Sequence, residues 1–141
     1  MRPRYQALFE RMQDPDPLKA DAAFDAVLFD REGAIPDTVE CLQKARRAPA
    51  LRFMCVQLLG FSGASAAIAP LVAALDDPDA EVRAEACRSL EDLKAHTAIP
   101  ALHARLDDMD PGVRLAAAEA ILGIEGGSES AGDAGDEAPP G

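Results

Sequence analysis

The sequence has no tryptophan, and aromatic residues make up only 4% of its 141 residues. The core of a β-sandwich or barrel draws on aromatic and β-branched side chains, whereas the alanine and leucine that dominate here suit closely packed helices. The longest stretch without a charge, residues 53–75, contains Gln57 and Pro70 and so does not resemble a membrane span. The opening MRPRYQALFERMQD lacks the apolar segment of a signal peptide. We therefore expect a cytoplasmic, all-α protein of one domain that does not insert into a membrane.

Basic residues are also few, since 14 Lys and Arg stand against 25 Asp and Glu, for a net charge of −11. A negative field repels phosphate backbones, which argues against nucleic-acid binding. One local exception lies between Glu40 and Asp76, where the only charged residues are four bases: Lys44, Arg46, Arg47 and Arg52.

Residue types for metal or nucleophilic chemistry are sparse. His96 and His103 are seven residues apart and neither is followed by glutamate. Cys41, Cys55 and Cys87 are odd in number and widely spaced, unlike a disulfide framework or a zinc site, and no histidine stands near them in sequence to activate a thiolate. No glycine-rich phosphate loop is present. We predict buried, reduced thiols and no catalytic residue, metal or cofactor.

The sequence contains an internal repeat, over residues 68–93 and 99–124, with matched positions thirty-one residues apart. A fixed period of this length marks a solenoid, in which each unit buries its apolar face on its neighbours. The segment DPDPLKADAAFDAV and the segment that carries Leu51-Arg52 are weaker copies. The sequence thus predicts a repeat domain over residues 1–125 with four helix-turn-helix units, at about 4–29, 35–60, 65–93 and 97–124.

The first unit is the least regular. Its second helix, residues 18–29, is expected to bury Leu18, Ala22, Val27, Leu28 and one or both of Phe24 and Phe29. All six aromatic residues lie in the first 61 positions, where they would pack the N-terminal end of the stack. The alternative is that an exposed Phe29 or Phe61 anchors a partner.

The end of the chain changes character. The helix expected over residues 112–124 is apolar around much of its circumference, although terminal repeats normally present a polar outer face. Residues 126–141 are rich in Gly, Pro and acid, and we predict a disordered acidic tail there. Either that tail, a partner or a second copy of the chain would cover the helix, so self-association through it is one hypothesis.

The segments DDPDAEVRAEACRSL and AIPALHARLDDMDPGVRLAAAEAILG resemble HEAT repeats, in particular the short units of phycobilisome-lyase type. This resemblance implies a right-handed α-α superhelix, an α-solenoid of about four helical hairpins. It also implies a structural ladder in which aspartates accept hydrogen bonds in the inter-helix turns and arginines bridge to acids of their own or the adjacent unit. The residues of that ladder would be Asp77, Arg83, Asp108 and Arg114.

The leading functional hypothesis is a non-catalytic scaffold or adaptor that binds another protein. By the thirty-one-residue period, Arg46 stands where Asp77 and Asp108 stand in later units, so Arg52 lacks an acidic partner in its own unit. We predict that Arg46, Arg47 and Arg52 form a docking site for an acidic segment of a partner, a phosphate group or the protein's own acidic tail, unless acids of neighbouring units satisfy them. The resemblance also implies an alternative, a bilin lyase-type subunit or chaperone that handles the chromophore of phycobiliproteins.

Overall fold

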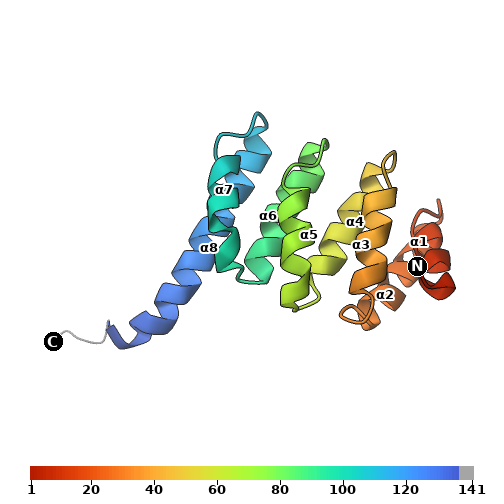
Figure 1. Ribbon diagram of the computed structural model, residues 1–141, viewed down its shortest axis with the longest axis horizontal. Helices are drawn as coiled ribbons and strands as arrows, with labels where there is room; N and C mark the ends of the chain where they lie inside the picture. Colours follow the sequence, from red (N-terminus) through yellow and green to blue (C-terminus); the bar gives the residue numbers. More distant parts are fainter. Residues whose placement is uncertain (137–141) are drawn as a thin grey trace.

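The protein is helical over the residues that the structure describes (Figure 1). This computed structural model describes residues 1–136, with side chains as far as Gly126. The helices are α1 (Pro3–Arg11), α2 (Pro17–Phe29), α3 (Ile35–Lys44), α4 (Pro49–Gly60), α5 (Ile68–Ala74), α6 (Ala80–Asp92), α7 (Ile99–Arg105) and α8 (Pro111–Asp136). Short 3-10 helices at Ser65–Ala67 and His96–Ala98 lead into α5 and α7.

Successive helices pair into four hairpins, of which the last three stack sideways in a row. Helices α3, α5 and α7 stand side by side in one layer, and α4, α6 and α8 form the layer behind them (Figure 1). The closest packing between hairpins joins α4 to α6 and α6 to α8. The prediction of an all-α solenoid of about four helical hairpins is therefore confirmed. None of the helices described combines the length and the apolar character needed to cross a membrane.

Local sequence signals decide where the second helix of each hairpin begins. Helices α2, α4 and α8 begin at Pro17, Pro49 and Pro111, at a position where the missing N–H costs no hydrogen bond. The side chains of Asp16 and Asp79 accept hydrogen bonds from the first backbone amides of α2 and α6. The proline and aspartate signals therefore fix where the second helix of each hairpin begins.

Close contact between second helices depends on small residues. A side-chain carbon added at Gly60, the last residue of α4, would lie 2.5 Å from Oγ of Ser89 on α6. The same Ser89 hydroxyl donates a hydrogen bond of 3.1 Å to the carbonyl of Val56. A continuous core of buried side chains extends from α3 to α8 around this contact.

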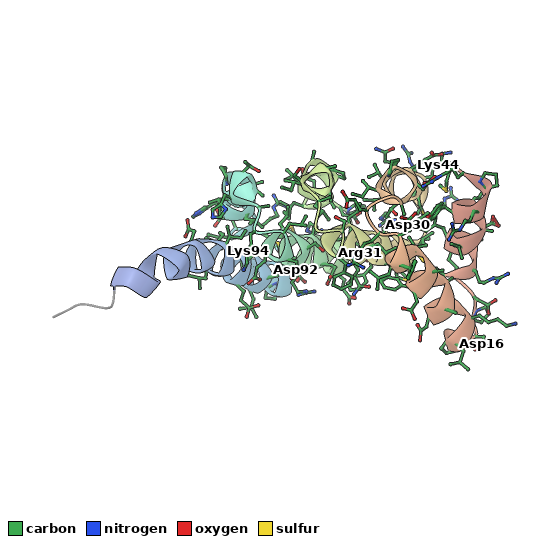
Figure 2. The ribbon with its side chains drawn as sticks, turned by 90° about the horizontal axis from the view of Figure 1, so that it is seen from below. Asp16, Asp30, Arg31, Lys44, Asp92 and Lys94 are labelled. Carbon is green, nitrogen blue, oxygen red and sulfur yellow. The ribbon has the colours of Figure 1, made fainter. Side chains whose placement is uncertain are left out.

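The first hairpin is turned away from the row formed by the other three, with Asp16 at its far end (Figure 2). It is tied to α3 by Arg2, whose backbone N–H and guanidinium bind the buried carboxylate of Asp37 at 2.6–2.9 Å. The hydroxyl of Tyr5 also donates to Asp30, at the end of α2. A second, smaller core cluster joins α1 and α2 to α3 and α4.

This different placement overturns part of the prediction for α2. Leu18 is 80% exposed and Ala22 is exposed as well, while Ala23 and Val27 are the residues that α2 buries. The repeat pattern placed Leu18 at a core position of a regular unit. Because the hairpin is fixed to α3 through α1 and does not stack in register, α2 presents another face to the core. Phe29 is 90% exposed.

Helix α8 extends to Asp136, beyond the end at residue 124 that the repeat predicts. The predicted disordered tail, residues 126–141, begins within this extension, and residues 137–141 lie outside the described residues. The division into a repeat domain and a disordered tail stays a prediction.

Candidate functional site

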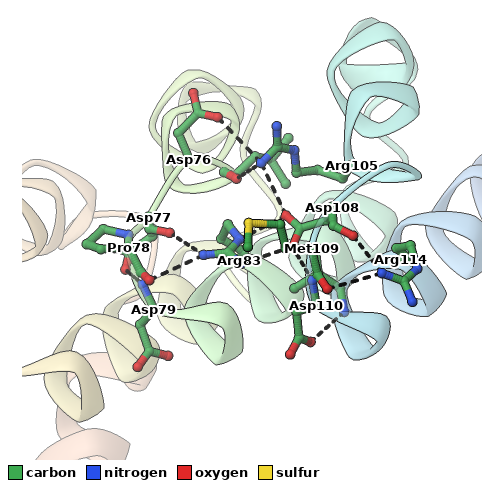
Figure 3. A network of polar contacts seen from close by, with 12 residues as sticks. Asp76, Asp77, Pro78, Asp79, Arg83, Arg105, Asp108, Met109, Asp110 and Arg114 are labelled. Carbon is green, nitrogen blue, oxygen red and sulfur yellow. Dashed lines mark hydrogen bonds and ion pairs between the residues drawn. The ribbon is translucent and has the colours of Figure 1, made fainter.

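The most regular polar feature is a pair of arginine–aspartate contacts between neighbouring hairpins, and Figure 3 shows the one between Arg83 and Asp108. Arg83, near the start of α6, donates from Nε and Nη2 to the two carboxylate oxygens of Asp108, at 3.0 and 2.9 Å. Its Nη1 donates to the carbonyls of Asp77 and Pro78 in its own turn, at 2.8 and 3.3 Å. The guanidinium therefore joins the turn of one hairpin to the turn of the next.

Arg52 makes the same contacts one hairpin earlier. Its Nε and Nη2 donate to Asp77 at 2.9 and 3.1 Å, and its Nη1 donates to the carbonyls of Ala45 and Arg46 at 2.8 and 2.9 Å. Each arginine thus binds an aspartate twenty-five residues later in the chain. Arg52 is only 7% exposed.

These contacts remove Arg52 from the predicted docking site. Its charge is buried and neutralised by an acid of the following hairpin, which was the alternative to docking. The sequence alone did not identify Asp77 as the partner of Arg52, because that aspartate lies twenty-five residues later in the chain, in the following hairpin.

The two aspartates also organise their own turns. Asp77 accepts a hydrogen bond from the amide of Asp79 at 2.9 Å, and Asp108 accepts one from the amide of Asp110 at 3.0 Å. Asp108 has a second cation as well, since Nη1 of Arg105 lies 3.2 Å from its carboxylate. The hydrogen bond from the Arg83 guanidinium is the main cause that lowers the pKa of Asp108, so this carboxyl is ionised at neutral pH.

Arg114 occupies the same place on α8 but has only half of these contacts. Its Nη1 donates to the carbonyls of Asp108 and Met109, at 2.8 and 3.2 Å, as Arg83 does in its own turn. No carboxylate among the side chains described, up to Gly126, accepts from its Nε or Nη2. Arg114 therefore contacts carbonyl oxygens rather than the acid that the resemblance implied.

Arg46 and Arg47 lie in the turn between α3 and α4, at the edge of an open groove of about 960 Å³. Both side chains are exposed, and neither makes a hydrogen bond or ion pair with any side chain that the structure describes. Their neighbour Lys44 is paired with Glu40 at 2.7 Å. Arg46 and Arg47 thus present two uncompensated positive charges.

The floor of this groove is largely apolar. It is formed where α1 faces α3 and the start of α4, by side chains that include the buried Phe9, Cys41 and Leu51. Gln6, Glu10 and Gln13 of α1 line the side opposite the two arginines. The groove therefore combines an apolar floor with a basic edge at Arg46 and Arg47, while Glu10 lies on the opposite side.

The other side chains that could bind a metal or act as nucleophiles are two histidines and three cysteines, of which Cys41 and Cys55 lie in contact with each other. His96 and His103 are both exposed, and Cys41, Cys55 and Cys87 are buried free thiols. Within the described part of the chain, no three His, Cys, Asp or Glu side chains come together as metal ligands would.

Comparison with protein families matches residues 68–134, just under half of the chain, to the model of HEAT repeats. The two hairpins within this segment are similar to HEAT repeats. The matched segment begins with α5 and covers the two hairpins in which the thirty-one-residue period is clearest. A search of curated proteins found no match to the chain. HEAT repeats commonly mediate contacts between proteins and are typically not catalytic.

Proposed function

We propose that this HEAT-repeat protein is a non-catalytic adaptor or scaffold that binds an acidic segment of another protein. The binding site is the groove between α1, α3 and the start of α4, with Arg46 and Arg47 as its charged edge. One observation carries the proposal: these two arginines are exposed without a side-chain partner among the described residues, in a protein whose net charge is −11.

The turn that presents the two arginines is held in place before any partner arrives. Nη1 of Arg52 donates to the carbonyls of Ala45 and Arg46, while the rest of its guanidinium is bound to Asp77. Binding therefore does not have to order this part of the backbone, which reduces the entropic cost of association. In this account Arg52 is a positioning residue, and Arg46 and Arg47 contact the partner.

The groove also indicates the chemistry of the partner. Carboxylates would pair with the two guanidinium groups, and an apolar side chain would cover the floor near Phe9 and Leu51. Because the arginines are exposed at the edge, they should contribute mainly to the association rate and to specificity. Added salt should screen this electrostatic contribution and weaken binding.

The narrower assignment to repeats of phycobilisome-lyase type implies a different ligand, a bilin on a phycobiliprotein. Coexpression with a bilin and a phycobiliprotein subunit separates the two functions. Transfer of the chromophore, or bilin absorbance on the purified protein, would contradict the adaptor proposal.

The direct test is affinity capture with the double variant Arg46→Glu/Arg47→Glu. A matched control is Lys19→Glu/Arg31→Glu, which changes the net charge equally at two exposed bases outside the groove. We expect the wild type and the control to retain a partner that the groove variant loses. Equal retention by all three proteins would refute the role of Arg46 and Arg47.

A further inference from the structure

The second helices α4 and α6 each present the same three positions, spaced four residues apart, to the hairpin that follows. On α4 these are Arg52, Val56 and Gly60. Arg52 binds Asp77, the carbonyl of Val56 accepts from Ser89, and Gly60 lies against Ser89. All three positions are buried.

On α6 the corresponding positions, thirty-one residues later, are Arg83, Cys87 and Glu91. Arg83 binds Asp108, Cys87 is fully buried, and the side chain of Glu91 lies directly against Gly123 of α8. These three positions therefore define the stacking face of a second helix in this solenoid.

On α8 the same positions are Arg114, Ala118 and Leu122, and none of them is buried. Leu122 is 70% exposed, and Leu115, about two helical turns earlier on the same side of α8, is 60% exposed. The guanidinium of Arg114 is already held on one side by its own turn, as in the two earlier helices, with Nε and Nη2 left for a carboxylate. Helix α8, at the end of the stack, thus carries the same kind of stacking face that the next hairpin covers on α4 and α6.

The face on α8 is complementary to itself. Arg114 and the exposed Glu125 are eleven residues, or about three helical turns, apart, so they lie on the same edge of the face with the leucines beside them. When two identical helices pack antiparallel about a two-fold axis, residues of the same edge meet. Arg114 would then meet Glu125 of the other copy, and Leu115 would meet Leu122, each contact occurring twice.

We propose that a second copy of the chain covers this face, with the two α8 helices packed antiparallel about a two-fold axis. Closed two-fold dimers are the commonest oligomers, and they require a self-complementary patch of this kind. Head-to-tail stacking is less well supported, because the first hairpin is turned away from the row and offers no matching face in register (Figure 2). This dimer does not depend on the groove at Arg46 and Arg47.

Sedimentation velocity of the full chain over a wide range of concentrations tests the proposal. We expect a monomer–dimer equilibrium with no larger species. Leu122→Lys should abolish the dimer, whereas Leu18→Lys, at a leucine of the first hairpin that is also largely exposed, should leave it unchanged. A wild type that stays monomeric, or equal loss in both variants, would overturn the proposal.

Charge exchange tests the antiparallel arrangement. Arg114→Glu alone and Glu125→Arg alone should each weaken the dimer by about tenfold or more, because each places like charges opposite one another. The combination of both substitutions in one chain should restore it. A double variant no better than the single ones would rule out this pairing.

A crosslink gives a readout that does not depend on affinity. Ala118 lies near the two-fold axis, so Ala118→Cys should form a disulfide-linked dimer under mild oxidation, while the buried native cysteines should not. Absence of this crosslink in a folded variant would contradict the arrangement. The groove variant Arg46→Glu/Arg47→Glu should dimerise normally, so failure of one proposal is distinguishable from failure of the other.

Discussion

Replacement of Arg52 by methionine is the perturbation that best tests how the hairpins are held together. Methionine keeps an unbranched apolar stem but removes all four guanidinium hydrogen bonds, two to Asp77 and two to backbone carbonyls. Asp77 would remain buried and keep only the amide of Asp79 as a hydrogen-bond donor among the described residues.

Removing one partner of a buried ion pair costs about 3–5 kcal/mol, since the other charge stays desolvated. A domain of this size is typically stable by about 5–15 kcal/mol, so the loss would be a large fraction of the total. Arg83→Met should cost less, because Arg105 remains 3.2 Å from Asp108. Lys44→Met breaks an exposed pair four residues apart on one helix and should cost only about 0.3–0.5 kcal/mol.

Urea denaturation followed by circular dichroism measures the free energy of unfolding of the three variants. The expected order of destabilisation is Arg52→Met, then Arg83→Met, then Lys44→Met. If Arg52→Met destabilised the protein no more than Lys44→Met, the contact with Asp77 would not be structural. Arg52 would then return to the candidate docking site.

Two further predictions concern close packing and buried thiols. Gly60→Ala should destabilise the protein by about 1–3 kcal/mol in urea denaturation, because the added carbon meets Ser89, whereas at Gly126 the added carbon would meet nothing within 4 Å outside its own stretch of helix, so Gly126→Ala should not destabilise the protein. Native Cys87 should resist a thiol reagent at pH 8 until the protein is unfolded, since burial raises its pKa to about 11. Rapid labelling of the thiol in the native protein would contradict this. The same rise in pKa should make the free energy of unfolding decline as pH rises from about 8.5, the pKa of an unfolded cysteine, through about 11.

The repeat period was sufficient to predict the fold because it is carried by residues that every regular hairpin needs. Apolar positions of both helices recur at a fixed spacing in the three regular hairpins, and the last two also share a turn with aspartates at Asp77 and Asp79 and at Asp108 and Asp110. The first hairpin does not follow this rule. Its placement depends on Arg2 reaching Asp37, thirty-five residues away, and no local pattern encodes that contact. The exposure of Leu18 follows from the same contact.

The candidate site could be predicted only in part. The local excess of basic residues located Arg46 and Arg47, but it did not separate them from Arg52, because composition does not reveal which charges are paired across hairpins. That Nε and Nη2 of Arg114 have no carboxylate partner among the described side chains could not be predicted from the sequence around Arg114. It becomes visible only when its contacts are compared with those of Arg52 and Arg83.

The measurement that tests the central claim most directly is the affinity of the captured partner for purified wild type and for Arg46→Glu/Arg47→Glu, by titration calorimetry at low and high salt. The adaptor account predicts that the double variant, although equally stable, binds the partner at least about tenfold more weakly than the wild type at low salt. High salt should reduce this difference in affinity. Equal affinity of the two proteins at low salt would contradict it.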